Sequence, residues 1–299
     1  MDLSGVYPAL TTPFAADGSV SLPDLKHNID RYNRTDLAGY VVLGSTGESV
    51  LLSRTEMDGI LATVKEAASK DKRLIAGTGA ESTAETIERT KRAAELGYHV
   101  ALVKTPHYYK PMYKPDVLIA HYRRVAEASP IPVLLYSVPQ FTGVTLEAPE
   151  VAALAEQANI IGIKDSSAHV LRIAEMVAAA PPSFQILTGG AAVLLPSLTV
   201  GAHGAILALA AALPEKCVAL YDLVRRGQAE QARELQTSLL RASKAIVSEA
   251  GIGGVKFVMD QRGYRGGLPR LPLVPPSEAA RQRILEVLAA PREPAAARV

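Results

Sequence analysis

The residue with the clearest chemical potential in this sequence is Lys164, which directly follows the apolar run Ile160–Ile163. Such a run is typical of a buried strand, so the lysine amine is expected to emerge inside or at the mouth of the fold. Withdrawal from water disfavours the ammonium form, and a neutral lysine amine attacks carbonyl carbons to form a Schiff base. An ion pair with Asp165, or with another carboxylate, is the alternative interpretation of the same position.

Tyr136 ends another apolar run, Val133–Tyr136, and is the second candidate. Beside a Schiff-base lysine, its hydroxyl would move the protons that carbinolamine formation and carbon–carbon cleavage require. The alternative is a core tyrosine whose hydroxyl is satisfied by a carbonyl.

The segment Gly44-Ser45-Thr46-Gly47-Glu48 also follows an apolar run and leads towards a predicted helix. Its backbone amides and two hydroxyls are suited to hold a carboxylate, helped by the helix N-terminus. The alternative is an ordinary capping turn.

Two glycine-rich segments, Thr188-Gly189-Gly190-Ala191 and Gly201-Ala202-His203-Gly204, give a competing hypothesis. Many barrel enzymes bind phosphate near the last two strands, so a phosphate-handling or flavin-binding enzyme is the alternative class. Neither segment contains Lys or Arg, and close backbone packing is the structural explanation of the glycines.

The histidines show no metal-binding pattern. None forms a His-x-His or His-Glu-x-x-His pair, so neither a metal site nor a metal-dependent aldolase or hydrolase is expected. The six are scattered along the chain, at His27, His99, His107, His121, His169 and His203.

The candidates above follow short apolar runs that recur along the chain and predict strands buried on both faces. The eight predicted strands are Val6–Leu10, Tyr40–Leu43, Leu74–Ala76, Val100–Val103, Val133–Tyr136, Ile160–Ile163, Gln185–Leu187 and Gly204–Leu207. Amphipathic helical patterns between them include Thr55–Ala68, Ser82–Leu96, Lys114–Ala128, Pro149–Ala155 and Val170–Ala180. This alternation predicts an α/β fold, a (β/α)8 TIM barrel, whose site lies at the carboxyl ends of the strands. A doubly wound sheet would carry a glycine fingerprint after its first strand, and Thr11-Thr12-Pro13-Phe14 has none.

After the last predicted strand the pattern becomes helical. Helices are predicted at Leu213–Arg226, Gln228–Val247 and Ser277–Leu288, with a Gly/Pro-rich section at Gly251–Pro276. We therefore expect a catalytic barrel at residues 1–227 and a C-terminal helical appendage at residues 228–299. The tail Ala289–Val299 is expected to be disordered.

The length fits one large domain of the (β/α)8 type, or two medium ones. The 299 residues carry 32 Lys+Arg against 30 Asp+Glu, without the basic excess of a nucleic-acid binder. The one cysteine, Cys217, excludes an internal disulfide. Neither a signal peptide nor an apolar run long enough to cross a bilayer is present, so a soluble cytoplasmic protein without membrane or nucleic-acid partners is expected.

Together these segments resemble the dihydrodipicolinate synthase/N-acetylneuraminate lyase family of class I aldolases. The resemblance extends from Gly5 to about Leu288, and five segments occur in the family's order and spacing. They are Gly44-Ser45-Thr46-Gly47-Glu48, Gly77-Thr78-Gly79, Thr105-Pro106 with Tyr108, Tyr136-Ser137-Val138-Pro139 and Gly162-Ile163-Lys164-Asp165.

The resemblance implies that pyruvate, or the pyruvate end of a 2-oxo acid, condenses with Lys164 without a metal or organic cofactor. Tyr136 would be the general acid/base, and Ser45 and Tyr108 would complete a hydroxyl relay. In the family the equivalent of Tyr108 often reaches across from a neighbouring subunit, and the usual assembly is a homotetramer, a dimer of dimers.

The resemblance also implies the residues that bind the substrate. Ser45 and Thr46 would bind the carboxylate, with Ser45 standing where many synthases have threonine. Gly189 and Ile206 match positions that line the pyruvate pocket.

The expected partners are a 2-oxo acid and an aldehyde. Dihydrodipicolinate synthases typically carry an arginine two residues after the proline of the tyrosine motif, where this chain has Phe141. Phenylalanine cannot clamp a carboxylate, so the sequence favours an enzyme like 4-hydroxy-2-oxoglutarate aldolase, acting on pyruvate and glyoxylate. The doubled tyrosines Tyr108-Tyr109 and the segment Gly251–Lys256 are also more similar to that group.

Other functions stay open as alternatives. Within the family they are 4-hydroxy-tetrahydrodipicolinate synthase and sialic acid or sugar-acid lyases and dehydratases. A non-catalytic protein that senses a 2-oxo acid is a further alternative, of a different class from the aldolases.

Overall fold

The computed structural model describes residues 1–289, and its centre is a ring of eight parallel strands. These are β1 (Gly5–Pro8), β2 (Gly39–Val42), β3 (Arg73–Gly77), β4 (Val100–Lys104), β5 (Val133–Ser137), β6 (Ile160–Asp165), β7 (Gln185–Thr188) and β8 (Gly204–Leu207). Neighbours pair in the order β1-β8-β7-β6-β5-β4-β3-β2. Backbone hydrogen bonds from Ala38 to Val6 (3.0 Å) and from Leu10 to Val41 (2.9 Å) join β1 to β2. The predicted (β/α)8 barrel is confirmed, and each strand ends within two residues of its predicted limits.

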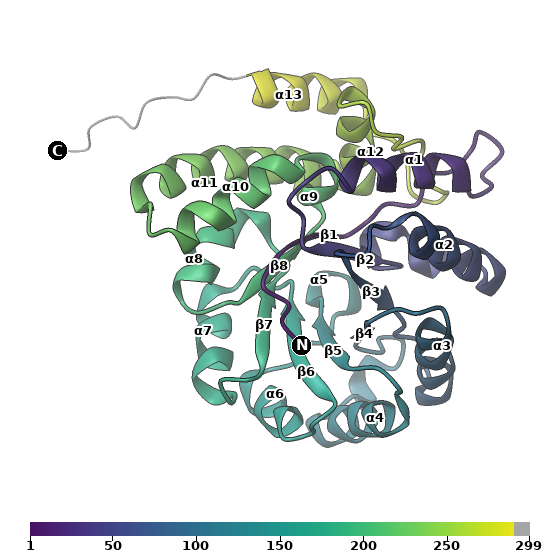
Figure 1. The fold of residues 1–299 in the computed structure, drawn as a ribbon, viewed down its shortest axis with the longest axis vertical. Coiled ribbons are helices and arrows are strands. Elements are labelled where there is room, and N and C mark those ends of the chain that lie inside the picture. The colour runs from purple at the N-terminus through teal and green to yellow at the C-terminus, as the bar shows by residue number, and fades with distance from the viewer. Residues whose placement is uncertain (290–299) are drawn as a thin grey trace.

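Helices surround the ring and cover its outer face (Figure 1). They are α1 (Leu22–Tyr32), α2 (Arg54–Ala67), α3 (Thr83–Glu95), α4 (Pro115–Ala128), α6 (Ala148–Ala155), α7 (Val170–Ala179) and α8 (Leu194–Thr199). The short helix α5 (Pro139–Thr142) instead lies over the end of the ring, directly after β5 (Figure 1). Helix α2 begins with a capping box, in which Ser53 and Glu56 each accept a hydrogen bond from the other's backbone. The single-turn 3₁₀ helices η1 (Ser45–Gly47), η2 (Ser49–Leu51), η3 (Lys110–Met112) and η4 (Ala191–Val193) lie in the loops.

The last part of the chain is a helical layer at one end of the molecule (Figure 1). It comprises α9 (Leu209–Ala212), α10 (Pro214–Arg225), α11 (Ala229–Ser243), the π-helical turn η5 (Lys244–Glu249), α12 (Gly251–Gln261) and α13 (Glu278–Ala289). The helical appendage is therefore present, while the division at residue 227 stays a prediction. Of the tail expected to be disordered, only Ala289 is described, and it ends α13.

The Gly/Pro-rich section Gly251–Pro276 begins with a helix that the sequence pattern does not predict, α12. Its glycines permit close packing. A Cβ at Gly254 would overlap the Ile246 carbonyl, and one at Gly253 would lie 2.7 Å from the Val274 carbonyl. The sequence shows only the low helix propensity of these glycines, and tertiary packing outweighs it.

The barrel interior is an apolar cluster separate from the larger core between strands and helices. Strand residues such as Val41, Ile75, Leu134 and Leu187 fill it, and it includes Tyr136 near the carboxyl ends of the strands. Alternation along the strands sends their other side chains outward against the helices. No helix within residues 1–289 is long and apolar enough to cross a membrane.

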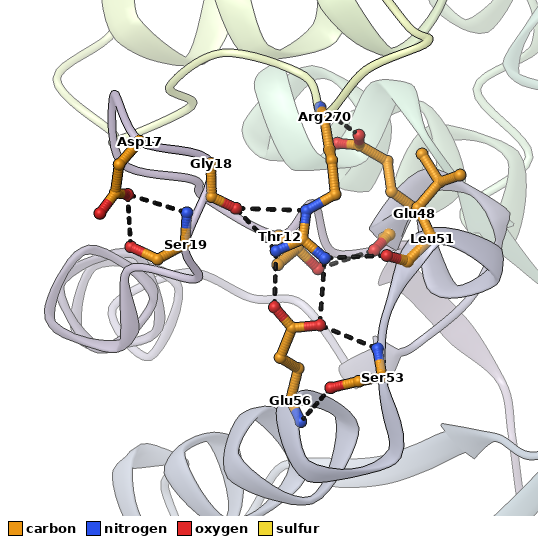
Figure 2. A network of polar contacts seen from close by, with 10 residues as sticks. Thr12, Asp17, Gly18, Ser19, Glu48, Leu51, Ser53, Glu56 and Arg270 are labelled. Atoms are coloured by element: carbon orange, nitrogen blue, oxygen red, sulfur yellow. Dashed lines mark hydrogen bonds and ion pairs between the residues drawn. The ribbon is translucent and has the colours of Figure 1, made fainter.

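Arg270 ties the segment after α12 back to the barrel (Figure 2). Its guanidinium donates to both carboxylate oxygens of Glu56 at 2.6 and 3.0 Å. It also donates to the carbonyls of Gly18 (2.7 Å) and Leu51 (2.8 Å). One side chain therefore connects the C-terminal segment to two loops of the barrel.

Replacing Glu56 with Gln is expected to destabilise the fold in a pH-dependent way. Hydrogen bonds from Arg270 lower the pKa of Glu56 from its usual 4.5 to about 2. A carboxylate with a lowered pKa stabilises the fold above about pH 4.5, and this contribution fades as the pH falls towards about 2. Thermal unfolding should show a melting temperature a few degrees lower for Glu56→Gln at pH 7, with the difference shrinking below pH 4.5. A difference that is constant across this range would contradict the prediction.

Candidate active site

The pairing of β5 with β6 places the two main candidates side by side. Tyr136 and Lys164 are directly opposite in the register of the two strands. Both side chains are 4% exposed, and the Lys164 Nζ lies 4.2 Å from the centroid of the Tyr136 ring. A buried amine and a phenol in contact form an acid–base pair suited to carbonyl chemistry.

The alternative interpretation of Lys164, an ion pair with Asp165, is not what the structure shows. Asp165 turns to its own loop, where its Oδ1 accepts from the backbone (3.0 Å) and the hydroxyl of Ser167. Its Oδ2 has no hydrogen-bond partner among the described residues. Burial raises the pKa of the Asp165 carboxyl group, because it disfavours the charged carboxylate that an ion pair with Lys164 would need.

The predicted carboxylate-binding segment forms the turn η1 and faces Tyr136. The Ser45 Oγ and the Tyr136 Oη are 3.4 Å apart. Its residues do not cap α2, since Ser53 does so, and the interpretation as an ordinary capping turn therefore fails. The turn is bracketed by left-handed residues, Leu43 (φ 60°) and Glu48 (φ 57°). Such conformations are costly for non-glycine residues and are often found at functional sites.

A cavity of about 110 Å³ surrounds these groups. The residues that line it come from the strand ends and the loops after them, including η1, and from α5, η5 and the start of α12. They are Ser45, Thr46, Tyr136, Gln140, Phe141, Lys164, Ser166, Gly189, Ile206, Ala208, Val247, Gly251, Ile252 and Val255. Lys164 is the one charged side chain among them. The structure thus brings together Lys164, Tyr136, Ser45, Thr46, Gly189 and Ile206, six of the seven residues expected from the sequence.

Tyr108 is the candidate that the single chain does not bring to the cavity. Its side chain is 76% exposed and packs edge-to-face on Tyr109, with ring centroids 5.0 Å apart. Its loop is held by Glu81, whose Oε2 accepts from the backbone amides of His107 (3.0 Å) and Tyr108 (2.9 Å). The tyrosine is therefore presented outward from a fixed loop.

Sequence reasoning missed the cluster that holds this loop. The Glu81 Oε1 lies 2.5 Å from the His107 Nδ1 and 3.5 Å from the Lys104 Nζ. Burial lowers the pKa of Lys104, which ends β4 and is in register with Tyr136. The signal that could have found it is the same as for Lys164, a lysine directly after an apolar strand.

The glycines that suggested a phosphate or flavin site instead allow close packing of the backbone. A Cβ at Gly189 would overlap the Ser166 hydroxyl, and one at Gly204 would lie 2.6 Å from the Gly5 carbonyl. Pockets for drug-sized ligands usually measure about 300–1,000 Å³, so the cavity suits a small acid better than a flavin. Within residues 1–289, no group of three or more His, Cys, Asp or Glu side chains is placed to hold a metal ion.

Comparison with known families decides the class. Residues 2–290 match the dihydrodipicolinate synthetase family. The chain belongs to this family. Its members are class I lyases that form a Schiff base between a lysine and pyruvate and need no metal or other cofactor, and the chain is therefore a lyase of this aldolase type.

Several similar proteins are named for a specific reaction. A 4-hydroxy-tetrahydrodipicolinate synthase from Exiguobacterium sp. is 37% identical over 285 residues, covering 95% of this chain and 97% of the relative. One from Xanthomonas campestris pv. campestris is 38% identical, covering 97% and 95%. The crystal structure of a dihydrodipicolinate synthase from Bacillus anthracis superposes with a TM-score of 0.93 at 28% identity, covering 98% of this chain and 100% of the other.

These relatives bear on the subfamily expected from the sequence. The similarity to 4-hydroxy-2-oxoglutarate aldolase is not confirmed, and the names of the curated relatives support the alternative, 4-hydroxy-tetrahydrodipicolinate synthase.

Proposed function

We propose that this family member is a pyruvate-dependent aldolase in which Lys164 is the Schiff-base lysine. The observation that carries the proposal is the contact between the buried Lys164 amine and Tyr136 inside a cavity without any other charged side chain. A lysine amine in contact with a phenolic hydroxyl group is the arrangement that Schiff-base formation with a carbonyl substrate needs.

The reaction begins when the Lys164 Nζ attacks C2 of pyruvate. Tyr136 protonates the departing hydroxyl, water leaves and an imine remains. The imine withdraws electrons from C3, which loses a proton to give an enamine. C3 of the enamine then attacks the aldehyde carbon, whose oxygen takes up a proton. When the aldehyde carries an amino group, that amine attacks the imine carbon, expels the Lys164 amine and closes a cyclic imine. Otherwise hydrolysis releases an open-chain product from Lys164. Run backwards, the same steps cleave a 4-hydroxy-2-oxo acid.

The remaining predicted residues support these steps. Ser45 lies within reach of Tyr136 and relays its proton. The hydroxyls and amides of Ser45 and Thr46 bind the pyruvate carboxylate, while Gly189 and Ile206 shape the pocket around it. Tyr108 faces outward, which supports its insertion into the relay of a second copy within a homotetramer. We infer a cytoplasmic location from the composition of the chain.

The comparisons support 4-hydroxy-tetrahydrodipicolinate synthesis as the physiological reaction. Removing the three carbons of pyruvate from this seven-carbon product leaves 2-amino-4-oxobutanoate as the aldehyde. A second candidate, cleavage of 4-hydroxy-2-oxoglutarate to pyruvate and glyoxylate, is favoured by one observation. Phe141 and Gln140 line the outer part of the cavity without a cation. The carboxylate of 2-amino-4-oxobutanoate lies two carbons further from the aldehyde carbon than that of glyoxylate, so the longer aldehyde depends more on a clamp at this outer wall.

Replacing Lys164 with Ala is expected to abolish imine formation. Borohydride reduction in the presence of pyruvate, followed by peptide mass spectrometry, should place the pyruvyl adduct on Lys164 of the wild type. Lys104→Ala is the matched control, because Lys104 also ends a strand beside Tyr136, and it should retain the adduct. An adduct that persists in Lys164→Ala would assign the chemistry to another lysine.

Replacing Tyr136 with Phe is expected to lower turnover about 10²-fold or more, the scale of a lost general acid/base. The imine should still form, because Lys164 is intact. Tyr122→Phe is the control, since Tyr122 is equally buried but donates its hydroxyl to Val103 outside the cavity (3.2 Å). Steady-state rates that are equal in both variants would remove Tyr136 from the mechanism.

The two candidate reactions differ in the aldehyde that the wild type uses. We expect a higher kcat/KM with 2-amino-4-oxobutanoate than with glyoxylate, measured with pyruvate saturating in both assays. The comparison should include Phe141→Arg, which adds a carboxylate clamp, and Phe141→Leu, which removes the ring without adding charge. A preference for glyoxylate in the wild type that only Phe141→Arg reverses would establish the second candidate instead.

A further inference from the structure

A buried ion pair, Glu48–Lys256, lies next to the cavity but does not line it. The Glu48 Oε1 and the Lys256 Nζ are 2.6 Å apart, and both side chains are fully shielded from solvent. Lys256 also donates to the Leu268 carbonyl at 2.9 Å and lies 4.5 Å from the centroid of the Phe14 ring. The chemistry proposed above uses neither charge.

The pair joins two walls of the cavity that are distant in sequence. Glu48 ends the turn η1, two residues after Thr46, and Lys256 directly follows Val255 in α12. Thr46 and Val255 both line the cavity. The distance between these two walls therefore depends on the Glu48–Lys256 contact, whose residues follow Thr46 by two positions and Val255 by one.

Glu48 is fixed by further contacts that hold the turn in place (Figure 2). Its Oε2 accepts from the backbone amide of Arg270 at 2.8 Å. Thr12 donates to the Gly47 carbonyl at 2.7 Å from the other side of the turn. The left-handed backbone of Glu48 persists only where such contacts define it, so the side chain of Glu48 and the shape of the turn are coupled.

Stability alone does not account for an ion pair at this place. Burying two charges is costly, and apolar replacements of buried pairs are often neutral or stabilising. Removing one partner is harmful, because it leaves a single charge buried. In some proteins such a pair specifies the geometry between the elements that carry it.

We propose that Glu48 and Lys256 are positioning residues that hold the Ser45–Thr46 turn against α12 and thereby set the affinity of the cavity for the carboxylate end of the 2-oxo acid. The inference rests on the proposed function, since it assigns that carboxylate to the turn. Misplacement of a binding group by about 1 Å is enough to lower catalytic efficiency by about two orders of magnitude.

The test uses Glu48→Gln, Lys256→Met and the double variant, and measures pyruvate-dependent borohydride trapping and thermal unfolding. The single variants should lose stability, because each leaves one uncompensated charge. The double variant should recover stability but keep a half-saturating pyruvate concentration about tenfold or more above that of the wild type. Its yield of adduct at saturating pyruvate should stay near the wild-type value, because Lys164 and Tyr136 are untouched.

Glu215→Gln is the matched control. Glu215 pairs with Arg262 (3.0 Å) and ties the other end of α12 to α10, but this pair is exposed and far from the turn in sequence. This variant should leave half-saturation unchanged. The inference would be overturned if the double variant recovered the wild-type half-saturating pyruvate concentration along with its melting temperature.

A crystal structure of the double variant separates this inference from the proposed function. We expect the Ser45–Thr46 turn to move relative to Val255. If wild-type protein traps no pyruvate but the turn moves, the proposed function fails while the positioning role stands. If the turn keeps its place, the positioning role fails whatever the substrate is.

Discussion

The register between β5 and β6 is the constraint on which the site depends. It sets Tyr136 opposite Lys164, so that neighbouring parallel strands deliver an amine and a phenol to the same end of the barrel. A shift of either strand by one residue would turn its own side chain, Tyr136 or Lys164, away from the interior. The buried apolar residues of β5 and β6 prevent that shift, and the packing of the barrel therefore also specifies the chemistry.

The second wall of the cavity depends on close approach rather than on strand register. Helix α12 packs closely against η5 and the segment Val274–Pro276, because Gly253 and Gly254 leave room for neighbouring backbone. Val255 and Ile252 then exclude water from the side of Lys164 that the strands leave open. An apolar wall of this kind strengthens the electrostatic interactions inside the cavity. The proposed imine, which accepts electron density from C3 of the substrate, depends on such interactions.

Much of this arrangement could be predicted from the sequence, because the strand signal is local. An apolar run followed by a polar residue identifies both the strand and the side chain at its end, as at Lys164 and Tyr136. The same logic misses contacts between distant segments, such as Lys256 with Glu48. It also misses α12, where packing overrides glycine propensity. Tyr108, which the resemblance to the family places in the hydroxyl relay, lies outside the cavity of the single chain.

The two halves of the proposed reaction depend on different parts of the fold. The groups proposed for the pyruvate half stand on strand ends and on a turn held by buried contacts, so their positions follow from the barrel itself. The wall proposed for the aldehyde half is formed by Gln140 and Phe141 on the short helix α5, and Phe141 is 64% exposed. A side chain so exposed is replaced at little cost to the core. Changing the aldehyde therefore needs substitutions on this wall alone, whereas changing the pyruvate half would require rebuilding the barrel rim.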